Sequence, residues 1–361
     1  MPARSVVGRK GDDLTPTLSI CIPTYNFGEF IGATLASIVA HVPADLEIVV
    51  VDGASTDNTA EIVGSWQQRF PGLKYFRLEK RGGIDHDLAK SIELATGDYC
   101  WLFSSDDIMR ADALERVQHR IRSAHDLYVC RHTICDKSMR RLWDHPVFAD
   151  GRERLVEFSD AAQRRECLEA AENTEALFSF MGSLVIRKEK WDSVQPVPEF
   201  MSSCWGHVAR LLAIGQRQLK VCYVPETWLD KRGDNDSFLE RGVVNRFRIA
   251  IDGFVGISRH FFGEDSPETR SVKRFLRNEL PLSAFLYARD QVSRSPDTES
   301  RAELDRIFEL CYRGRGFSGV IVGLLYSYLP IGVYRHLKTS YAFVRNAVRR
   351  FKGGSHGAPN P

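Results

Sequence analysis

A chain of 361 residues in which 43% are hydrophobic can bury a sizeable core, either as one large domain with an appendage or as two domains. Its 49 basic and 47 acidic side chains leave a formal charge of +2, which excludes the global positive field typical of nucleic-acid-binding proteins. Eight cysteines are scattered along the chain and "MPARSVVGRKGDDLTP" lacks the apolar core of a signal peptide, so we expect a reduced cytosolic protein.

The first hundred residues alternate between apolar strands and amphipathic helices. Strands are predicted at "LSICIPTY", "LEIVVVDG", "LKYFRLE" and "YCWLFS". Helices are predicted at "EFIGATLASIVAH", after the capping side chains of "STDNTAEIV", and at "DHDLAKSIELA", which Gly97 closes. Near-continuous hydrophobic strands between helices are typical of a parallel sheet covered on both faces. The predicted fold class is therefore α/β, a Rossmann-like, mostly parallel sheet flanked by helices.

The remainder of the chain continues this pattern and then changes. We expect a helix at "ADALERVQHRIRSA", strands at "DLYVCRHTI", "SFMGSLVIRKEKW" and "LKVCYVPETWLD", and a helix at "SCWGHVARLLAIG". Residues 136–173 are mixed and charged and give no readable pattern. From about residue 240 the pattern becomes helical. These features predict an N-terminal tail over 1–17, an α/β domain over 18–240 and a helical C-terminal region over 241–361.

Polar side chains follow three of the predicted parallel strands. Thr24, Tyr25 and Asn26 follow the first, Asp52 ends the second, and residues 104–107 follow the fourth. Ligands of such sheets bind outside the carboxyl ends of the strands. The three groups are therefore expected to share one crevice, whereas turn formation alone would explain each group singly.

The adjacent carboxylates Asp106 and Asp107 repel each other unless a cation or hydrogen-bond donors meet them. Mg²⁺ and Mn²⁺ bind protein through one or two carboxylates and fill their other positions with water and phosphate oxygens. The pair therefore predicts a divalent ion on a diphosphate, and Asp52 could accept from a ribose hydroxyl or a base N–H. The chain has neither a Walker sequence nor a Gly-x-Gly-x-x-Gly after the first strand, which weakens kinase and dehydrogenase interpretations.

Cys130 and Cys135 are the one close pair of cysteines, with His132 between them. No second pair of ligands stands at zinc spacing, so we expect ordinary buried thiols here.

The first half of the chain resembles a family 2 glycosyltransferase with the GT-A fold. Four stretches in order carry the resemblance: "SICIPTYN", "EIVVVDGASTDNT", "GGIDHDLAKSIELATGDYCWLFSSDD" and "GSLVIRKEKW". It is close over about 18–107 and looser to about 238. Within the family, "GGIDHD" and "WLFSSDD" are most similar to the abequosyltransferase-like group of bacterial surface-polysaccharide enzymes.

The resemblance implies a role for each motif. The residues expected to bind the base and ribose of a nucleotide sugar are Pro23, Thr24, Tyr25, Asn26 and Asp52. Those expected near the ribose, diphosphate or donor sugar are Gly83, Asp85 and Asp87, although both aspartates could instead be helix-dipole partners in a capped first turn. Asp106 and Asp107 stand at the family's Asp-x-Asp motif and are the expected metal ligands, with Asp106 also near the donor. Ser104 replaces the first aspartate of many members, which leaves open which carboxylate carries the ion.

An inverting transferase needs a general base to deprotonate the acceptor hydroxyl. Many family 2 enzymes place an aspartate at the helix that here reads "MSSCWGHVARLL", which has no carboxylate. His207 is the candidate base because its unperturbed pKa suits the task, and Glu199 is the second candidate. A core histidine beside Trp205 is the alternative. If neither acts, Asp85 or Asp87 could serve, or the enzyme could retain configuration.

Two further segments have more than one interpretation. The loop "KRGDNDSF" either reaches back to the crevice, with Arg232 near phosphate, or is an ordinary surface turn. The uncharged stretch 317–334 is followed by basic residues and predicts an interfacial or re-entrant helix pair on anionic lipid. The alternative is a hydrophobic hairpin packed on the catalytic domain or on a second copy. The basic residues in question are Arg335, Lys338, Arg345, Arg349, Arg350 and Lys352.

Together these features predict a hexosyl- or deoxyhexosyltransferase, peripheral on the inner face of the cytoplasmic membrane. Its expected partners are a nucleotide-sugar donor, Mg²⁺ or Mn²⁺, and a polyprenyl-diphosphate-linked acceptor of O-antigen, exopolysaccharide or other surface-glycan synthesis; no nucleic acid is expected, and homo-oligomerisation stays open. One alternative is a nucleotidyltransferase, although "PTYNFGEF" lacks the Gly-rich loop and nearby Lys or Arg usual there. The other is a degenerate GT-A domain acting as a non-catalytic subunit.

Overall fold

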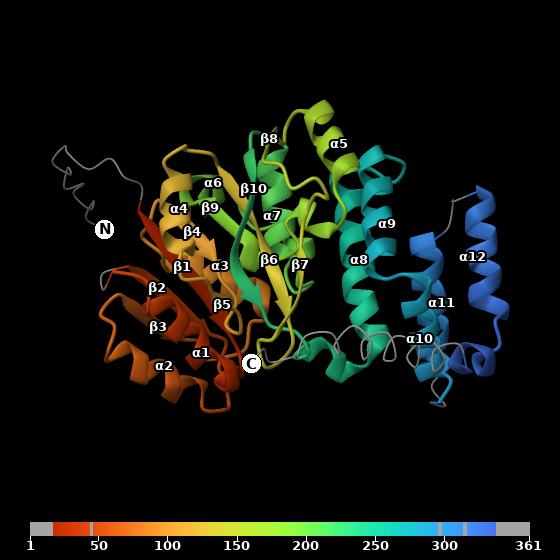
Figure 1. Ribbon diagram of the computed structural model, residues 1–361, viewed down its shortest axis with the longest axis horizontal. Coiled ribbons are helices and arrows are strands. Elements are labelled where there is room, and N and C mark those ends of the chain that lie inside the picture. Colours follow the sequence, from red (N-terminus) through yellow and green to blue (C-terminus); the bar gives the residue numbers. More distant parts are fainter. Residues whose placement is uncertain (1–16, 44–45, 295–297, 313–315, 337–361) are drawn as a thin grey trace, which may run out of the picture. The chain divides into compact units, whose positions relative to one another are not determined.

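The computed structural model describes residues 17–43, 46–294, 298–312 and 316–336. The predicted alternation of strands and helices is confirmed in the first hundred residues. The elements are β1 (Leu18–Thr24), α1 (Gly28–Val39), β2 (Glu47–Asp52), α2 (Thr59–Gln67), β3 (Leu73–Arg77), α3 (Ile84–Leu94) and β4 (Tyr99–Leu102). β1 pairs in parallel with β2 and β4, and β2 pairs in parallel with β3 (Figure 1). The carboxyl ends of these strands therefore meet at one edge of the sheet.

Alternate side chains of β1 explain why both faces of the sheet need a helical cover. Ile20 and Ile22 are completely buried and join the main hydrophobic core with Leu35 of α1 and Val117 of α4 (Ala113–Ile121). On the opposite face the Cys21 thiol donates to the Ser91 carbonyl of α3, with Sγ and O 3.7 Å apart. A strand that is apolar on both faces must be covered twice, which is the pattern that predicted a parallel sheet.

The second half of the sheet is mixed. It contains β5 (Ile108–Met109), β6 (Leu127–Cys135), β9 (Leu184–Arg187) and β10 (Lys220–Lys231), and the strand order is β3-β2-β1-β4-β9-β6-β10-β5. β9 runs antiparallel to both β4 and β6, while β6 and β10 are parallel. The predicted α/β class with a mostly parallel sheet flanked by helices is confirmed, with these antiparallel pairs added beyond β4.

Residues 136–173, which gave no readable pattern, contain β7 (Arg141–His145), β8 (Arg154–Glu157) and α5 (Ala161–Ala170). β7 pairs with β6 and β8 pairs with β10, both antiparallel. The short elements that follow are η1 (Thr174–Leu177), η2 (Met181–Ser183), α6 (Lys188–Asp192), η3 (Pro198–Phe200), α7 (Gly206–Gly215) and η4 (Ser237–Arg241). The strands of this segment lie outside the main path of the sheet.

The chain forms two compact units, and the division falls within helices. The first unit comprises 1–237 and 253–272, and the second comprises 238–252 and 273–361. The boundaries between the units fall within η4, α8 (Val243–Phe262) and α9 (Pro267–Glu279), and the second unit also contains α10 (Leu282–Val292), α11 (Thr298–Tyr312) and α12 (Gly316–Tyr328). The predicted helical C-terminal region is confirmed, whereas the boundary near residue 240 stays a prediction.

Aromatic stacking builds the core of the second unit. The Phe308 ring stacks on Tyr326 of α12 with 3.9 Å between centroids, and the Phe285 ring meets Phe247 edge-on at 5.0 Å. The Tyr326 hydroxyl donates to the Asp305 carboxylate. Within the described residues, no helix combines the length and apolar character that a membrane-spanning segment requires.

Cys130 and Cys135 are thiols in the protein interior, as predicted. Cys130 belongs to the main core and Cys135 is 1% exposed. All eight cysteines are free and only Cys204 is partly exposed. Cys130 and Cys135, on either side of His132, are therefore ordinary buried thiols.

Gly97, which was predicted to close α3, makes a close approach between α3 and β1. A Cβ at this position would lie 2.8 Å from the Ser19 backbone nitrogen and 3.0 Å from the Leu18 carbonyl carbon. Gly97→Ala is therefore expected to lower the free energy of unfolding by about 1–3 kcal/mol, because backbone cannot move aside easily. Urea unfolding followed by circular dichroism measures the change.

Gly64→Ala is the matched control. Gly64 lies in the middle of α2, and an added Cβ would meet no described atom within 4 Å. This variant is expected to stabilise the protein by about 0.5–1 kcal/mol through helix propensity. Equal stabilities for the two variants would contradict the close approach at Gly97.

Candidate functional site

Asp106 and Asp107 follow β4 at the carboxyl edge of the sheet, where the loop after β10 closes over them. Asp107 is 1% exposed, and its Oδ1 accepts a hydrogen bond from the Arg232 backbone N–H at 2.9 Å. Its Oδ2 is buried without a hydrogen-bond partner among the described residues. Asp106 Oδ2 accepts from Asn235 Nδ2 at 2.6 Å. Of the two interpretations of this loop, the structure thus favours the one in which it reaches the carboxylate pair.

Burial raises the pKa of both carboxyl groups in this pair. The pKa of Asp107 lies well above its usual range because the neighbouring Asp106 adds a like charge to the effect of burial. Lys231 and Arg232 lower both pKa values but do not cancel the increase. A divalent cation would favour the ionised forms and fill the place beside Asp107 Oδ2, so these residues fit a hard metal ion held by few protein ligands.

Arg232 braces the loop around the carboxylate pair. Its Nε donates to the Asp106 carbonyl at 2.9 Å, and another guanidinium nitrogen donates to the Lys137 carbonyl. The guanidinium carbon lies 5.0 Å from the centre of the Phe30 ring. These contacts fix the guanidinium against backbone and ring, next to the expected diphosphate.

Asp52 and Asp87 form a second acidic group at the end of β2. Asp52 is fully buried, and its carboxylate accepts from the Ser55 backbone N–H at 2.7 Å and from the Tyr75 hydroxyl at 2.6 Å. Asp87 packs so closely on Gly53 that a Cβ there would lie 2.3 Å from its Oδ2. Burial, together with the charge of Asp52, raises the pKa of Asp87 to about 6. In the described part of the chain Asp87 Oδ1 has no hydrogen-bond partner, so it is available to a ligand.

The loop after β1 is tied to the loop after β2. Asn26 adopts a left-handed φ of 55°, its Oδ1 accepts from the Thr56 backbone N–H at 2.7 Å, and its own N–H donates to Ser55 Oγ at 2.9 Å. Thr24 is buried, and its hydroxyl has no hydrogen-bond partner within the described residues. The expected donor-binding residues of these two loops therefore share one rigid surface.

The remaining expected donor residues lie beside that surface. Pro23 is buried in β1 opposite Val51 of β2, and the Tyr25 ring carries the Arg81 guanidinium 4.1 Å from its centre. Gly83 precedes α3 with a φ of 90°, which an L side chain would strain. The sequence interpretation missed Arg81 as a candidate, although it stands directly before the "GGIDHD" motif.

Asp85 holds the segment in front of α7. Its Oδ2 accepts from the Cys204 backbone N–H at 2.9 Å and its Oδ1 accepts from the Gly206 N–H at 2.8 Å. A Cβ at Gly206 would lie only 3.0 Å from the Asp85 carboxyl carbon. Both carboxylate oxygens are engaged by backbone, which suits positioning better than proton transfer.

His207 lies in the first turn of α7, directly after this anchored segment. Its side chain is buried, and Nε2 lies 3.2 Å from the Phe178 carbonyl oxygen, so we assign the proton to Nε2 and leave Nδ1 as the acceptor. Burial lowers the pKa of His207, while the charge of Asp85 partly restores it. The imidazole is thus neutral at neutral pH, as a general base must be.

Trp205 and Glu199, which precede this histidine in the sequence, lie in different environments. The Trp205 ring meets the Phe254 ring of α8 edge-on at 4.6 Å, and a Cβ at Gly253 would lie 2.2 Å from Trp205 Cδ1. Glu199, the second candidate base, is exposed in η3. The structure therefore brings His207 together with Asp85 and leaves Glu199 on the surface.

Lys231 is a second residue that the sequence interpretation missed. Its Nζ lies 4.3 Å from the centre of the Phe180 ring, and its charge lowers the pKa of both Asp106 and Asp107. No spacing marks it in the sequence, because it is the last residue of a long strand. It adds positive charge where a diphosphate would lie.

Comparison with known proteins agrees with this arrangement. Residues 19–183 match glycosyl transferase family 2. The chain is 28% identical over 298 residues to the abequosyltransferase RfbV of Salmonella typhimurium, a match that covers 81% of this chain and 88% of that protein.

Two solved structures share the fold over nearly the whole chain. TarS 1–349 of S. aureus, in complex with UDP-GlcNAc, superposes with a TM-score of 0.56 at 14% identity and covers 90% of this chain and 91% of its own. The mannosyltransferase PcManGT from Pyrobaculum calidifontis, in complex with GDP-Man and Mn²⁺, gives 0.51 at 19% identity, covering 96% and 92%. The family match over residues 19–183, the long relative and the shared fold all point to glycosyl transferase family 2 as what this chain is similar to.

Proposed function

We propose that this protein is a family 2 glycosyltransferase that moves a sugar from a nucleoside-diphosphate sugar to a polyprenyl-diphosphate-linked oligosaccharide during surface-glycan synthesis. The observation that carries the proposal is the Asp106–Asp107 pair at the carboxyl edge of the sheet, in which Asp107 is buried and its Oδ2 has no hydrogen-bond partner among the described residues. The names of the relatives support the same class, since one is an abequosyltransferase and others are described as glycosyltransferases of PGL/p-HBAD biosynthesis.

Asp107, with Asp106, is proposed to hold Mg²⁺ or Mn²⁺. Bound there, the ion would neutralise charge on the departing nucleoside diphosphate. PcManGT was solved with Mn²⁺ and GDP-Man, which supports the same class of cofactor here. Ser104 contributes no charge at the position where many members have an aspartate, so the chain alone would hold the ion weakly and donor phosphates would complete its coordination.

The second acidic group is proposed to recognise the nucleoside. Asp87 Oδ1 and the Thr24 hydroxyl are both buried and open to a ligand, so they suit ribose hydroxyls or a base N–H. Asp52 already accepts hydrogen bonds from Ser55 and Tyr75. These bonds hold in place the residues on which the nucleoside would lie. The Arg81 guanidinium on the Tyr25 ring is placed to meet phosphate.

His207 is proposed as the general base through Nδ1. The Phe178 carbonyl fixes its tautomer, and Asp85 orients the first turn of α7 on which it stands. The neighbouring Asp85 charge would also stabilise the imidazolium that forms when the acceptor hydroxyl loses its proton. Asp85 is thus a positioning residue in this proposal.

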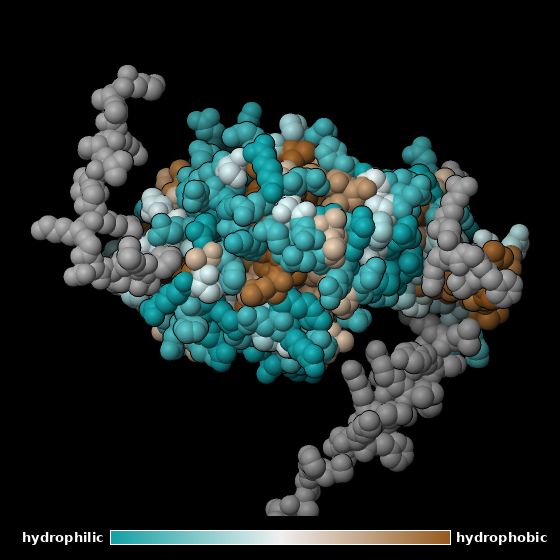
Figure 2. Space-filling model, turned by 90° about the horizontal axis from the view of Figure 1, so that it is seen from above, coloured by the Kyte–Doolittle hydropathy of each residue, from teal (hydrophilic) through white to brown (hydrophobic). Residues whose placement is uncertain are grey.

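The C-terminal helix is proposed to rest on the inner face of the cytoplasmic membrane. α12 packs through Tyr326 and exposes apolar side chains elsewhere on its surface, and Figure 2 shows hydrophobic surface at the end of the view where Figure 1 draws α12. The exposed side chains are Val320, Ile321, Leu324, Leu325 and Tyr328. The basic residues from Lys338 onward lie outside the described residues, whereas Arg335 pairs with Asp290. Apolar contact with lipid would remove this surface from water.

Asp107→Asn tests the metal site. We expect sugar transfer to fall by about 10²-fold or more, and Mn²⁺ to add nothing to nucleotide binding. The ligand-free protein should become more stable, because the variant removes a buried charge that Asp106 repels. Thermal shift with UDP, GDP, CDP and dTDP, with and without Mn²⁺, measures the effect of Mn²⁺ and the stability change, since a ligand at about 100 times its Kd adds about 2.7 kcal/mol; an assay of sugar transfer measures the loss of activity.

Asp112→Asn is the control, because Asp112 is an exposed aspartate paired with Arg116. It should leave transfer and the metal effect unchanged. Full metal-dependent turnover in Asp107→Asn would overturn the metal assignment. If no nucleotide shifted the wild-type melting curve and no donor were hydrolysed, the chain would instead be a non-catalytic subunit.

His207→Asn tests the base. We expect kcat to fall by about 10²–10⁴-fold while nucleotide binding stays intact, because the lost group acts only on the acceptor hydroxyl. In the wild type, activity should fall at acidic pH as His207 becomes protonated, at a pH below the usual histidine pKa. This fall should be absent from the pH profile of the variant. Steady-state kinetics measure kcat, and retained nucleotide-dependent thermal shift shows that the variant is folded. Glu199→Gln should be nearly silent, and the opposite ranking of the two variants would transfer the role to Glu199.

Leu324→Ser with Leu325→Ser tests membrane contact. Both side chains are about half exposed on α12, and their loss should weaken binding to phosphatidylglycerol-containing vesicles by about tenfold or more. Co-sedimentation of the full chain measures binding. Leu142→Ser with Leu155→Ser removes equally exposed apolar side chains of β7 and β8 and should change nothing. Equal effects of the two double variants would rule out a specific role of α12.

A further inference from the structure

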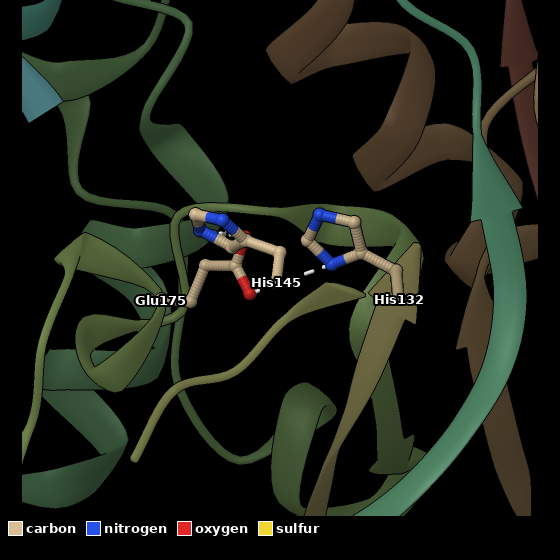
Figure 3. A group of neighbouring side chains, drawn as sticks. All are labelled: His132, His145 and Glu175. Carbon is tan, nitrogen blue, oxygen red and sulfur yellow. Dashed lines mark ion pairs between the residues drawn. The ribbon is translucent and has the colours of Figure 1, made fainter. Parts of the chain in front are cut away.

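We propose that His132, His145 and Glu175 form a second metal site, suited to Zn²⁺ and separate from the carboxylate pair. His132 of β6 and His145 of β7 are direct cross-strand partners, and Glu175 comes from η1 (Figure 3). One ligand atom from each residue lies within 4.8 Å of the other two. This goes beyond the proposed sugar transfer, which uses none of the three side chains.

The two distances between the carboxylate and the imidazoles are close to those around a tetrahedral ion. Glu175 Oε2 lies 3.5 Å from His132 Nδ1, and Oε1 lies 3.4 Å from His145 Nε2, along the dashed lines of Figure 3. Bonds of about 2.0–2.1 Å at tetrahedral angles place ligand atoms about 3.3 Å apart. The carboxylate therefore stands at ligand spacing from both imidazoles, and the two rings lie 5.1 Å apart between centroids on the same face of the β6–β7 pair.

His132 supplies an independent indication of a ligand. Its side chain is completely buried, and neither ring nitrogen has a hydrogen-bond partner in the described part of the chain. Burial of a polar group without a partner costs about 1–3 kcal/mol. An apolar side chain beside Phe180 would avoid this cost, so the imidazole at this place is best explained by an ion that it binds.

The residues around the cluster hold its members in place. Asn173 accepts from the Glu175 backbone N–H at 3.1 Å and donates to the Pro146 carbonyl at 2.9 Å, directly after His145. A further backbone hydrogen bond joins Glu172 to the Val147 carbonyl at 2.9 Å. The start of η1 is thus fastened to the end of β7. A metal site needs such outer contacts because they fix ligand orientation.

The ligand chemistry favours zinc over the ion of the sugar-transfer site. Two imidazoles and one carboxylate suit Zn²⁺ or Co²⁺, whereas Mg²⁺ and Mn²⁺ prefer oxygen ligands. Three protein ligands leave a fourth position for water, and the His145 side chain is 29% exposed, which gives the ion a path from solvent. Lys231 places a positive charge near the cluster, so we expect weaker binding than at a cysteine-rich zinc site.

An ion bound here would make the segment that contacts His207 more rigid. Glu175 lies in η1, which ends at Phe178 with a left-handed φ of 66°, and the Phe178 N–H donates to the Glu175 carbonyl at 2.9 Å. The Phe178 carbonyl is the group that meets His207 Nε2. The site is therefore structural in this inference, and it stands or falls independently of the role of His207.

The test is Zn²⁺ titration of the chelator-treated full chain, in excess Mg²⁺ to occupy the carboxylate pair. Calorimetry should show one Zn²⁺ per chain, and Co²⁺ should give the visible absorption of a tetrahedral site. Both signals should persist in the Asp106→Asn, Asp107→Asn double variant and in His119→Gln, which removes an exposed histidine. Zinc should also raise the melting temperature of the wild type.

His145→Asn and Glu175→Gln should each weaken Zn²⁺ binding at least about tenfold, since each removes one ligand. His145 is partly exposed, so its variant should fold, and a melting curve without metal verifies this. Absence of saturable Zn²⁺ uptake by the folded wild type would overturn the inference. Uptake that is unchanged in folded His145→Asn, or lost in the Asp106, Asp107 double variant, would overturn it as well.

Discussion

The arrangement of the first unit depends on burying acidic side chains at the carboxyl edge of the sheet. Asp52, Asp85, Asp87 and Asp107 are all at most 4% exposed. Backbone N–H groups meet the carboxylates of Asp52, Asp85 and Asp107, while Asp87 Oδ1 and Asp107 Oδ2 have no hydrogen-bond partner among the described residues. Because burial and mutual repulsion raise the pKa of Asp87 and Asp107, ionisation of these carboxyl groups destabilises the ligand-free fold, and the proposed cation and donor would offset that cost.

The loops of the site supply hydrogen-bond donors that replace water around these buried carboxylates. The donors of Asp85 and Asp107 come from segments more than a hundred residues further along the chain. Reaching them requires unusual backbone, since Ser202 and Cys204 both have left-handed φ angles of 80° and 74°. Such conformations cost about 1–3 kcal/mol each and persist where the surroundings hold them. The segment before α7 is thus shaped by the acid that it caps, and His207 takes its position from that shape.

Much of the fold could be predicted from the sequence because β1, β2 and β4 are apolar on both faces and are followed by polar residues. The same rule predicted that Asp52, Asp106 and Asp107 would approach one edge. The contacts of Asp85 with Cys204 and Gly206 could not be predicted, because nothing local links a carboxylate to amides 119 and 121 residues away. The His132–His145 pair was missed for a similar reason. Its second member lies on β7, an exposed strand whose side chains lack the apolar alternation on which strand prediction relies.

The contact between Trp205 and α8 bears on how such enzymes can be recombined. Gly253 leaves room for the Trp205 indole, and the Phe254 ring packs on it. The segment before α7 therefore packs on α8, a helix that follows the part of the sequence in which an α/β pattern is recognisable. Exchange of C-terminal regions between relatives by crossover near residue 240 would pair this tryptophan with a foreign helix. A unit that can be exchanged intact is therefore longer than the domain that the strand pattern outlines, because it must include the part of α8 that contacts Trp205.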